Sequence, residues 1–477
     1  MTVNEQVSTV GTPQTSGLVT RRPLVLALLV VCQLMLVIDT TVLNVALPHI
    51  QHDLGFTSTG LSWVVNAYTL VFGGLLLLGS RVGDLCGRRQ VFVAGITIFT
   101  LSSLAAGLAD SATVLIAARV AQAVGAAAAG PNALALITTT FTKPEDRVWS
   151  LGWFSAVASG GFPIGLMLGG VLTDLMSWRA TMFINVPIGI AALVLAPRLV
   201  PVPERHRAQL DLPGASAATG GVAALVFGLI RAAEHGWNDG PTIAVLVVGV
   251  VLVAAFLTIE SRTGQPLMPL RLFTDRNRGA AYSIMLLMPM VTISTFFFLT
   301  QFLQNVLGWN AFATGFAFLA MALGLVITSR STTWLLPRFG PKRLVITGTV
   351  LIVLGMAVLT RLSTTTGYFP GLLVPLVLLG VGTGLTFSSA NVVIMSTVEA
   401  RDAGAAGGTL QTMQELGSSL GLAVLITVFG FATGHAHSPS HALLVTGMTR
   451  AFAAAAIFAA CAFGVAFSFR STPHSDA

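Results

Sequence analysis

Long apolar stretches alternate with short polar connections along nearly the whole chain. About 20 apolar residues in a helix cross the roughly 30 Å of hydrocarbon in a bilayer, and stretches of that length recur fourteen times. The connections run from a few residues to about twenty, which is too short for a soluble domain. The pattern therefore predicts fourteen membrane-spanning helices, at 23–47, 61–80, 91–109, 112–136, 148–173, 180–200, 214–233, 241–260, 280–305, 311–330, 344–362, 370–396, 404–433 and 447–469.

Composition indicates the same class. Of the 477 residues, 54% are hydrophobic and 9% are charged, and the mean hydropathy is +0.84. A chain of this kind has lipid rather than water as its solvent, so we predict an all-α integral membrane protein. The net charge of +7 invites a nucleic-acid partner, but the basic residues are spread over many connections, and we expect none.

The basic residues indicate the orientation, because cytoplasmic loops retain Lys and Arg. Fourteen spans place both termini on one side of the membrane. If that side is cytoplasmic, twenty of the 25 Lys and Arg residues lie inside, four lie outside, and Arg119 lies within a span. Arginine far outnumbers lysine, which suggests a GC-rich bacterial genome. We therefore expect a multi-pass protein of the bacterial cell (inner) membrane with both termini cytoplasmic.

An internal repeat divides the chain. The connection after the second span and the one after the tenth share a glycine followed by basic residues, GRR at 87–89 and GPKR at 340–343. This spacing fits two parallel six-helix units with two extra spans between them. The expected divisions are a disordered tail at 1–20, an N-terminal six-helix bundle at 21–200, an inserted helix pair at 201–265, a C-terminal six-helix bundle at 266–470 and a tail at 471–477.

Three motifs carry a family resemblance. They read DTTVLNVALP at 39–48, DLCGRR at 84–89 and RVAQ at 119–122. The chain resembles the fourteen-helix drug:proton antiporters of the major facilitator superfamily, of EmrB/QacA type, from about residue 21 to 470. The resemblance implies the major facilitator fold, in which two six-helix bundles, here with an inserted two-helix hairpin, enclose a substrate site near mid-membrane. It also implies that the proton gradient supplies the energy and that no cofactor is needed.

The fifth span resembles the antiporter motif of that family, although Leu166 stands where the family carries proline. Small residues let helices approach closely in a membrane, and the proline that introduces a kink is displaced along this helix. The residues assigned to this motif helix are Gly161, Pro163, Gly165, Gly169 and Gly170.

Asp39 and Glu415 each lie well inside an apolar span, whereas the other sixteen acidic residues fall in or at the ends of connections. A carboxylate in hydrocarbon costs several kcal/mol unless a cavity, a partner or a proton relieves it. At 1.5 Å per residue, both lie about 15 Å from the nearer end of their span. We expect them to bind protons or cationic substrate; the alternative is a structural partnership inside the bundle.

Arg119 lies at a depth from which its side chain can reach Asp39, and we expect the two to pair, either as part of proton coupling or as a static contact. Gln411 lies one turn before Glu415 and lengthens the polar stripe on that helix. The resemblance adds Asn44 and Gln122 to this group. The candidate proton-coupling and substrate residues are therefore Asp39, Asn44, Arg119, Gln122, Gln411 and Glu415.

Two further groups are candidates for function. The resemblance assigns an inner gate to Asp84, Gly87, Arg88 and Arg89, although these charges could simply set topology. Tyr282, Phe297 and Phe298 could line an adaptable apolar pocket or could pack structurally. Three histidines in the last outer connection, at 435, 437 and 441, could bind a metal, but a polar loop of this kind is usually solvated, and we expect no metal.

These observations favour a proton-coupled secondary transporter that exports hydrophobic, often cationic, small molecules by alternating access, as in multidrug or antibiotic efflux. A dedicated exporter of one endogenous metabolite or lipid is the alternative within transport, and a non-transporting receptor or scaffold is the alternative from another class. No Walker lysine motif, HExxH or nucleophile elbow appears where it could act, so we expect no enzyme and no catalytic residues. The expected partners are a lipophilic, sometimes cationic substrate, protons and the bilayer, and we expect a monomer.

Overall fold

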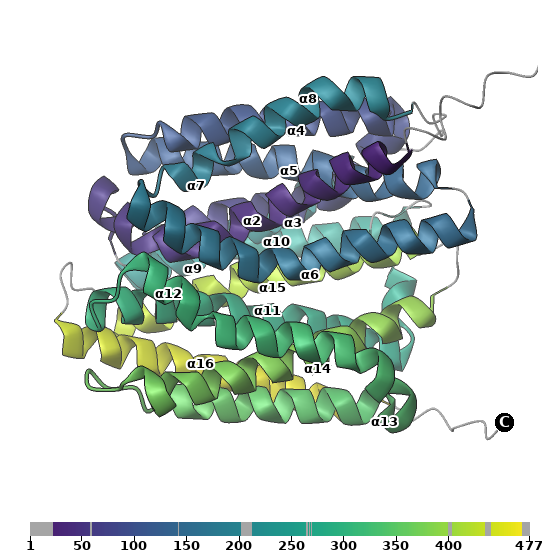
Figure 1. Ribbon diagram of the computed structural model, residues 1–477. Helices are drawn as coiled ribbons and strands as arrows, with labels where there is room; N and C mark the ends of the chain where they lie inside the picture. Colours follow the sequence, from purple (N-terminus) through teal and green to yellow (C-terminus); the bar gives the residue numbers. More distant parts are fainter. Residues whose placement is uncertain are drawn as a thin grey trace, which may run out of the picture.

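The computed structural model describes residues 22–57, 60–141, 143–201, 212–263, 266, 268, 270–398, 403–434 and 440–469, and nearly all of them are helical. The helices run roughly alongside one another in an elongated bundle (Figure 1). The side at which α2 begins and α16 ends is called the terminal side below, and the opposite one the far side. The expected tails at 1–20 and 471–477, with His435 and His437, fall outside the described residues.

The first group of helices, called the N-half, comprises α2 (Arg22–Leu54), α3 (Ser62–Cys86), α4 (Arg88–Gly107), α5 (Ala112–Thr140), α6 (Pro144–Leu175), α7 (Ala180–Phe183) and α8 (Asn185–Leu199). Two helices follow, α9 (Leu212–His235) and α10 (Gly240–Arg262). The remaining group, called the C-half, comprises η1 (Leu270–Phe273), α11 (Arg276–Gln301), η2 (Phe302–Val306), α12 (Ala311–Ala317), α13 (Leu319–Leu359), η3 (Tyr368–Leu372), α14 (Leu373–Ser396), α15 (Ala403–Ala432) and α16 (His441–Ala466).

Twelve helices in the described part of the chain are long and apolar enough to cross a membrane. Two shorter apolar helices, Ser62–Leu76 and Ile164–Leu175, lie within α3 and α6. The structure therefore supports an all-helical membrane protein with about twelve spans, and it does not establish the fourteen that the hydrophobic pattern predicts. The predicted sixth span is divided into α7 and α8.

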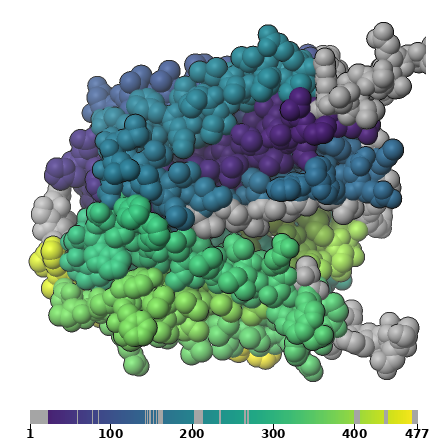
Figure 2. All heavy atoms as spheres, in the orientation of Figure 1, coloured from purple at the N-terminus to yellow at the C-terminus, as the bar shows by residue number. Residues whose placement is uncertain are grey.

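Each half is held together by its own helix contacts. In the N-half, α4 and α3 pack on α5, and α2 packs on α6; in the C-half, α13 packs on α14, and α11 packs on α15 and α16. Among the described residues, the halves meet where α3 contacts α15, where α6 contacts α12 and α13, and where α2 contacts α11 and α12. Figure 2 shows the two groups as adjoining masses, with the C-half below the N-half.

The α9 helix packs against both halves, through α3 on one side and α15 on the other. The hydroxyl of Thr427 on α15 donates a hydrogen bond to the carbonyl of Leu229 on α9, over 2.7 Å. In contrast, α10 packs mainly on α9 and leaves a row of valines, including Val247 and Val251, exposed. Such an apolar outer face is what a lipid-facing helix requires.

The two repeated loops share one backbone geometry. Gly87, between α3 and α4, has φ 101°, and Gly340, at a kink within α13, has φ 71°. Positive φ strains residues that carry a Cβ, and glycine adopts it freely. The shared glycine of the two sequence segments is thus explained by a sharp turn between helices at equivalent places in the two halves.

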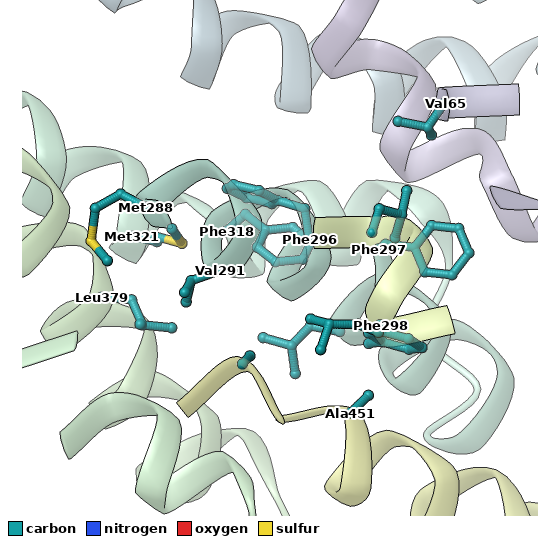
Figure 3. Close-up of a cluster of buried hydrophobic side chains, with 14 of the residues drawn as sticks. Val65, Met288, Val291, Phe296, Phe297, Phe298, Phe318, Met321, Leu379 and Ala451 are labelled. Carbon is teal, nitrogen blue, oxygen red and sulfur yellow. The ribbon is translucent and has the colours of Figure 1, made fainter. Parts of the chain in front are cut away.

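Aromatic side chains fill the core of the C-half (Figure 3). The rings of Phe297 and Phe298 on α11 lie edge to face with centroids 5.3 Å apart, and Phe298 also packs on Phe429 and Phe452. Edge-to-face contacts of this kind stabilise aromatic pairs. The core of this half is therefore a well-packed aromatic cluster.

Candidate functional site

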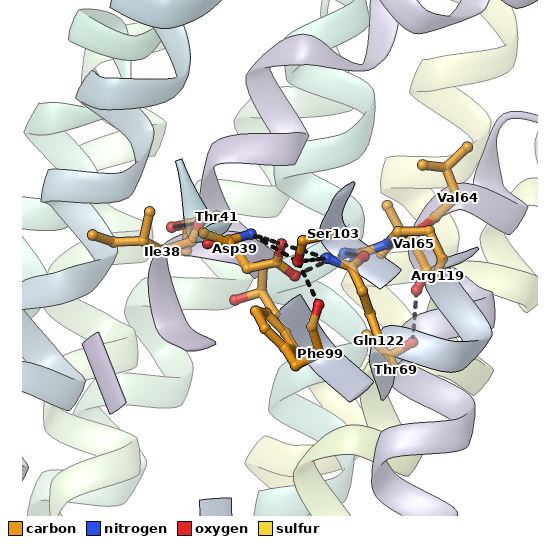
Figure 4. A network of polar contacts seen from close by, with 12 residues as sticks. Ile38, Asp39, Thr41, Val64, Val65, Thr69, Phe99, Ser103, Arg119 and Gln122 are labelled. Atoms are coloured by element: carbon orange, nitrogen blue, oxygen red, sulfur yellow. Dashed lines mark hydrogen bonds and ion pairs between the residues drawn. The ribbon is translucent and has the colours of Figure 1, made fainter. Parts of the chain in front are cut away.

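A network of hydrogen bonds surrounds Asp39 in the interior of the N-half (Figure 4). One carboxylate oxygen accepts a bond of 2.8 Å from Nη1 of Arg119 on α5. The other accepts bonds from the amide of Gln122 on α5, at 3.2 Å, and from that of Asn185 on α8, at 2.7 Å. Asp39 itself lies on α2, so the network joins three helices of one half.

Arg119 is held by more than its ion pair. Its Nε donates to the carbonyl of Val64 on α3 at 3.2 Å, and its guanidinium lies 4.3 Å from the centre of the Tyr68 ring. Its Nη1 also donates to the side-chain oxygen of Gln122 at 3.0 Å. A cation over an aromatic face is attracted by the ring. Arg119 therefore ties α3 and α5 to α2.

This network is buried, and both of its charged groups are hydrogen-bonded, while the side-chain oxygen of Asn185 has no partner among the described residues. Asp39 is 0% exposed and Arg119 is 1% exposed. Ser103 on α4 accepts a bond of 2.7 Å from Gln122 and donates to the carbonyl of Phe99. Desolvation costs as much as a buried ion pair gains unless further hydrogen bonds satisfy both charges. Here the carboxylate has three donors, which is the arrangement of a lasting structural contact.

The predicted pairing of Asp39 with Arg119 is present in the structure, which also brings Gln122, a candidate of the same group, into contact with both. Sequence reasoning missed three other members, Tyr68, Ser103 and Asn185. Asn185 and Tyr68 carried a usable signal, because each is a polar side chain within an apolar helix. Asn44 lies outside the network: its amide donates to the carbonyl of Thr40 at 3.0 Å, and its oxygen has no partner among the described residues.

Glu415 occupies a different position, on α15 where this helix crosses α3 of the other half. A Cβ placed on Gly73 of α3 would lie 2.5 Å from Cβ of Glu415, so the backbones approach closely there. The carboxylate accepts one long bond of 3.5 Å, from Gln411 one turn earlier. The ion pairs of the described residues do not include it. Glu415 is therefore a half-buried carboxylate between the halves, with one weak partner.

The glycines of α6 pack this helix tightly on two neighbours. Gly165 contacts Thr41 of α2, and a Cβ on Gly169 would lie 2.6 Å from the carbonyl oxygen of Val42. A Cβ on Gly161 would lie 3.0 Å from the Val37 side chain of the same helix. The face with Gly170 meets α12 of the C-half instead. These glycines thus allow close packing within and between the halves; the side chain of Pro163 is outside the described part.

The loop between α3 and α4 is bonded to neighbouring helices of the N-half. Arg88 donates to the carbonyl of Ala135 on α5 at 3.4 Å, and Arg89 donates to the carbonyls of Pro197 and Val200 at 3.4 and 3.1 Å. With Gly87 at the turn, these contacts fix the terminal-side ends of α3, α5 and α8 relative to one another. The side chain of Asp84 lies outside the described residues, and gating by this group stays a prediction.

The three aromatic pocket candidates lie in the core of the C-half. Phe297 and Phe298 are fully buried, and the hydroxyl of Tyr282 donates to the carbonyl of Ala406 at 3.2 Å. Their neighbours are other core side chains. None of the three lines the open cavity between the halves on the far side or the apolar cavity between α3 and α9. A role in substrate contact is untested and remains a prediction.

On the far side, hydrogen bonds join the two halves. Both carboxylate oxygens of Asp174, at the end of α6, accept backbone bonds from the start of α12, from Ala311 at 3.1 Å and Phe312 at 2.9 Å. The amide of Gln304 donates to the carbonyl of Val45 at 2.8 Å. Beside these contacts is an open cavity of about 640 Å³ lined by both halves. Sequence reasoning did not identify these hydrogen bonds between the halves.

Comparison with known proteins identifies the family. A family model described as the Major Facilitator Superfamily matches residues 29–422. The chain belongs to the major facilitator superfamily. Membership makes it a multi-pass membrane transporter rather than an enzyme.

Relatives within the superfamily extend over most of the chain. The puromycin resistance protein pur8 of Streptomyces alboniger is 40% identical over 442 residues, which cover 91% of this chain and 88% of that protein. The cephamycin export protein CmcT of Amycolatopsis lactamdurans is 40% identical over 439 residues, covering 91% and 90%. A crystal structure of the peptide transporter POT with sulfate has a TM-score of 0.65 at 12% identity, covering 94% of this chain and 96% of that one, and supports the fold alone.

Proposed function

We propose that this major facilitator protein is a secondary active transporter that exports hydrophobic or cationic small molecules in exchange for protons. Relatives at 40% identity are named for puromycin resistance and for cephamycin export, which supports antibiotic efflux as the activity. The single observation that carries the exchange mechanism is the position of Glu415, a weakly bonded carboxylate between the two halves.

Glu415 suits exchange because its negative charge lacks a fixed counter-charge among the described residues. A carboxylate in a membrane interior is costly unless a proton, a cation or water relieves it. A proton and a cationic substrate can then relieve the same charge in turn. Glu415 contacts Gly73 across the junction of α3 and α15. A proton or a cationic substrate bound to Glu415 can therefore influence how the halves pack against each other.

Asp39 supports a different assignment. Its three hydrogen bonds, one of which is also the ion pair with Arg119, leave little for a substrate to add. We assign the Asp39–Arg119 network to the stability and shape of the N-half, and proton exchange to Glu415. Arg119, Gln122 and Asn185 are positioning residues on this view.

The topology belongs to the same proposal. The short apolar segments Ser62–Leu76 and Ile164–Leu175 are parts of helices of 25 and 32 residues, each long enough to cross a bilayer. Counting both gives fourteen spans, with α9 and α10 as a pair inserted between two six-span halves. The excess of basic residues on the terminal side supports a cytoplasmic position for that side in a bacterial cell. The Gly87–Arg89 loop would act as the inner gate and Asp174 as part of the outer closure.

Everted membrane vesicles with an imposed pH gradient test the proposal. Adding puromycin to wild-type vesicles should dissipate part of the gradient, because export consumes it. Glu415→Gln should abolish this response, and Asp110→Asn, which changes an exposed acid in a loop, should leave it intact. A full response in Glu415→Gln would remove Glu415 from exchange, and the absence of any response in wild type across a broad panel of drugs would refute drug:proton antiport.

A further inference from the structure

Polar side chains without hydrogen-bond partners lie on the three helices that pack together near Glu415, α3, α9 and α15. Among the described residues, four that lack a partner are Asn66 on α3, Thr219 on α9, and Thr412 and Ser419 on α15. They are called the unpaired cluster below. Asn66 and Ser419 are both 0% exposed, and in Asn66 neither the amide nitrogen nor the amide oxygen has a partner.

Unpaired buried polar atoms also occur elsewhere among the described residues, as at Asn44 and Ser389, but only in Asn66 do both polar atoms of one side chain lack a partner. Serine and threonine in helices commonly donate to a carbonyl one turn earlier. Thr69 on α3 and Thr427 on α15 do so, to Val65 and Ala423, at 3.2 and 2.8 Å. The hydroxyls of Thr412 and Ser419 do not, although they lie on the same helix as Thr427.

Helix geometry places the cluster on facing surfaces of α3 and α15. Asn66 and Gly73 are seven residues apart, which puts them on one face of α3, about 10 Å apart along its axis. Gly73 is the residue that meets Glu415. On α15, positions 412, 415 and 419 share a face, and the opposite face, with Gly417 and Gly421, packs against α11. The cluster therefore follows the junction between the halves.

The α9 helix closes this junction on one side. A Cβ on Gly74 of α3 would lie 2.8 Å from the hydroxyl oxygen of Thr219. Thr219 also lines an apolar cavity of about 730 Å³ between α3 and α9. The cluster thus has an apolar recess beside it, suited to the non-polar part of an amphipathic molecule.

Buried polar groups in folded proteins nearly always have partners, and an asparagine side chain offers two donors and two acceptor sites. An amide that no protein group satisfies is therefore suited to bond a molecule that enters between the halves. Glu415 supplies a negative charge on the same faces of α3 and α15.

We infer that the strip from Asn66 to Glu415 recognises substrate and defines its chemistry. The substrate class is an amphipathic molecule that carries a protonated amine, which pairs with Glu415, and an amide or hydroxyl group about 10 Å away, which bonds to Asn66. This inference rests on the proposed function. Because the strip is shared by α3 and α15, a bound molecule of this kind contacts both halves.

Two probes separate the two contacts. Puromycin carries an amine together with amide and hydroxyl groups, whereas tetraphenylphosphonium is a lipophilic cation without hydrogen-bonding groups. Uptake of each into everted vesicles is measured in wild type and in Asn66→Leu, which keeps the number and branching of the side-chain heavy atoms and removes their polarity. We expect the KM for puromycin to rise about tenfold, the value of one good hydrogen bond, and that for tetraphenylphosphonium to change less than about twofold. The control is Ser389→Ala, which removes an unpaired hydroxyl on α14 and should change neither.

An unchanged KM for puromycin in Asn66→Leu would overturn the inference and leave the proposed function intact. An equal loss for both probes would also overturn it, because it would show a structural or water-binding role. If Asn66→Leu does not fold, Asn66→Ala is measured in its place, with the same expected difference between probes. Failure of wild type to transport these probes, or any other compound of a broad panel of drugs, with a pH gradient would instead refute the proposed function.

Discussion

Removing one partner of the Asp39–Arg119 pair should destabilise the protein far more than removing both. In Asp39→Asn, the guanidinium of Arg119 stays buried, at 1% exposure, without its counter-charge. Breaking a buried pair in this way costs about 3–5 kcal/mol, a large share of a typical total stability of about 5–15 kcal/mol. The double variant Asp39→Asn, Arg119→Met removes both charges and keeps a side chain of similar length at 119. We expect it to recover to within about 1–2 kcal/mol of wild type.

Thermal unfolding of wild type, Asp39→Asn, Arg119→Met and the double variant in detergent, followed by loss of the monodisperse species, measures this cycle. Arg119→Lys is a useful fifth protein, because lysine keeps the charge but cannot bond Val64 and Asp39 as the guanidinium fork does. The reasoning is refuted if the double variant is as unstable as Asp39→Asn, or if Asp39→Asn unfolds at the temperature of wild type.

The same variants separate structure from coupling. If the pair is a static contact, the double variant should still export substrate at the expense of a proton gradient, with the pH profile of wild type. A double variant that folds but no longer couples export to protons would show that Asp39 or Arg119 takes part in proton exchange, as the sequence allowed.

Three other predictions follow from particular contacts. Asp174→Ala removes two hydrogen bonds between the halves, worth together about 1–3 kcal/mol. The rate at which a membrane-impermeant maleimide labels a cysteine introduced on the far side should therefore rise at least about fivefold, and an unchanged rate would show that these bonds do not hold the halves together. Gly73→Val should displace Glu415 and abolish transport, whereas Gly464→Val, where a Cβ meets nothing within 4 Å, should not; equal effects would contradict the contact. Hydrogen bonds from Thr242 and Arg231 lower the pKa of Asp239 at the start of α10, so wild type should exceed Asp239→Asn in thermal stability at neutral pH, and this advantage should disappear as the pH falls through the lowered pKa. A difference in thermal stability that is constant from pH 7 to acid would contradict this last assignment.

The all-helical membrane class and the pairing of Asp39 with Arg119 could be predicted from simple rules, whereas the twelve long apolar helices of the described residues do not establish the predicted count of fourteen spans. Apolar length identifies a membrane helix, and two opposite charges at similar depth in apolar spans have little choice but to meet. The sequence also predicted the internal repeat, because a glycine before basic residues recurs at 87 and 340. The structure adds that both glycines form a turn with positive φ.

The rest depends on how helices rotate and pack, which one sequence does not reveal. Asn185 reaches Asp39 only because α8 lies beside α2, and Asp174 meets α12 only because the halves close on the far side. The lack of partners at Asn66 could not be foreseen, because a polar residue in an apolar helix is as consistent with a bonded state. Nor did the sequence distinguish the two acids, which lie at similar depth but differ in their surroundings.

The most direct test of the account is whether substrate displaces a proton from Glu415. Puromycin is added to the purified protein in weakly buffered detergent solution, and released protons are measured with a pH-sensitive dye. The account predicts release from wild type and from the folded Asp39→Asn, Arg119→Met double variant, and none from Glu415→Gln. Undiminished release from Glu415→Gln, or its loss in the double variant while puromycin still binds, would contradict the assignment of proton exchange to the carboxylate between the halves.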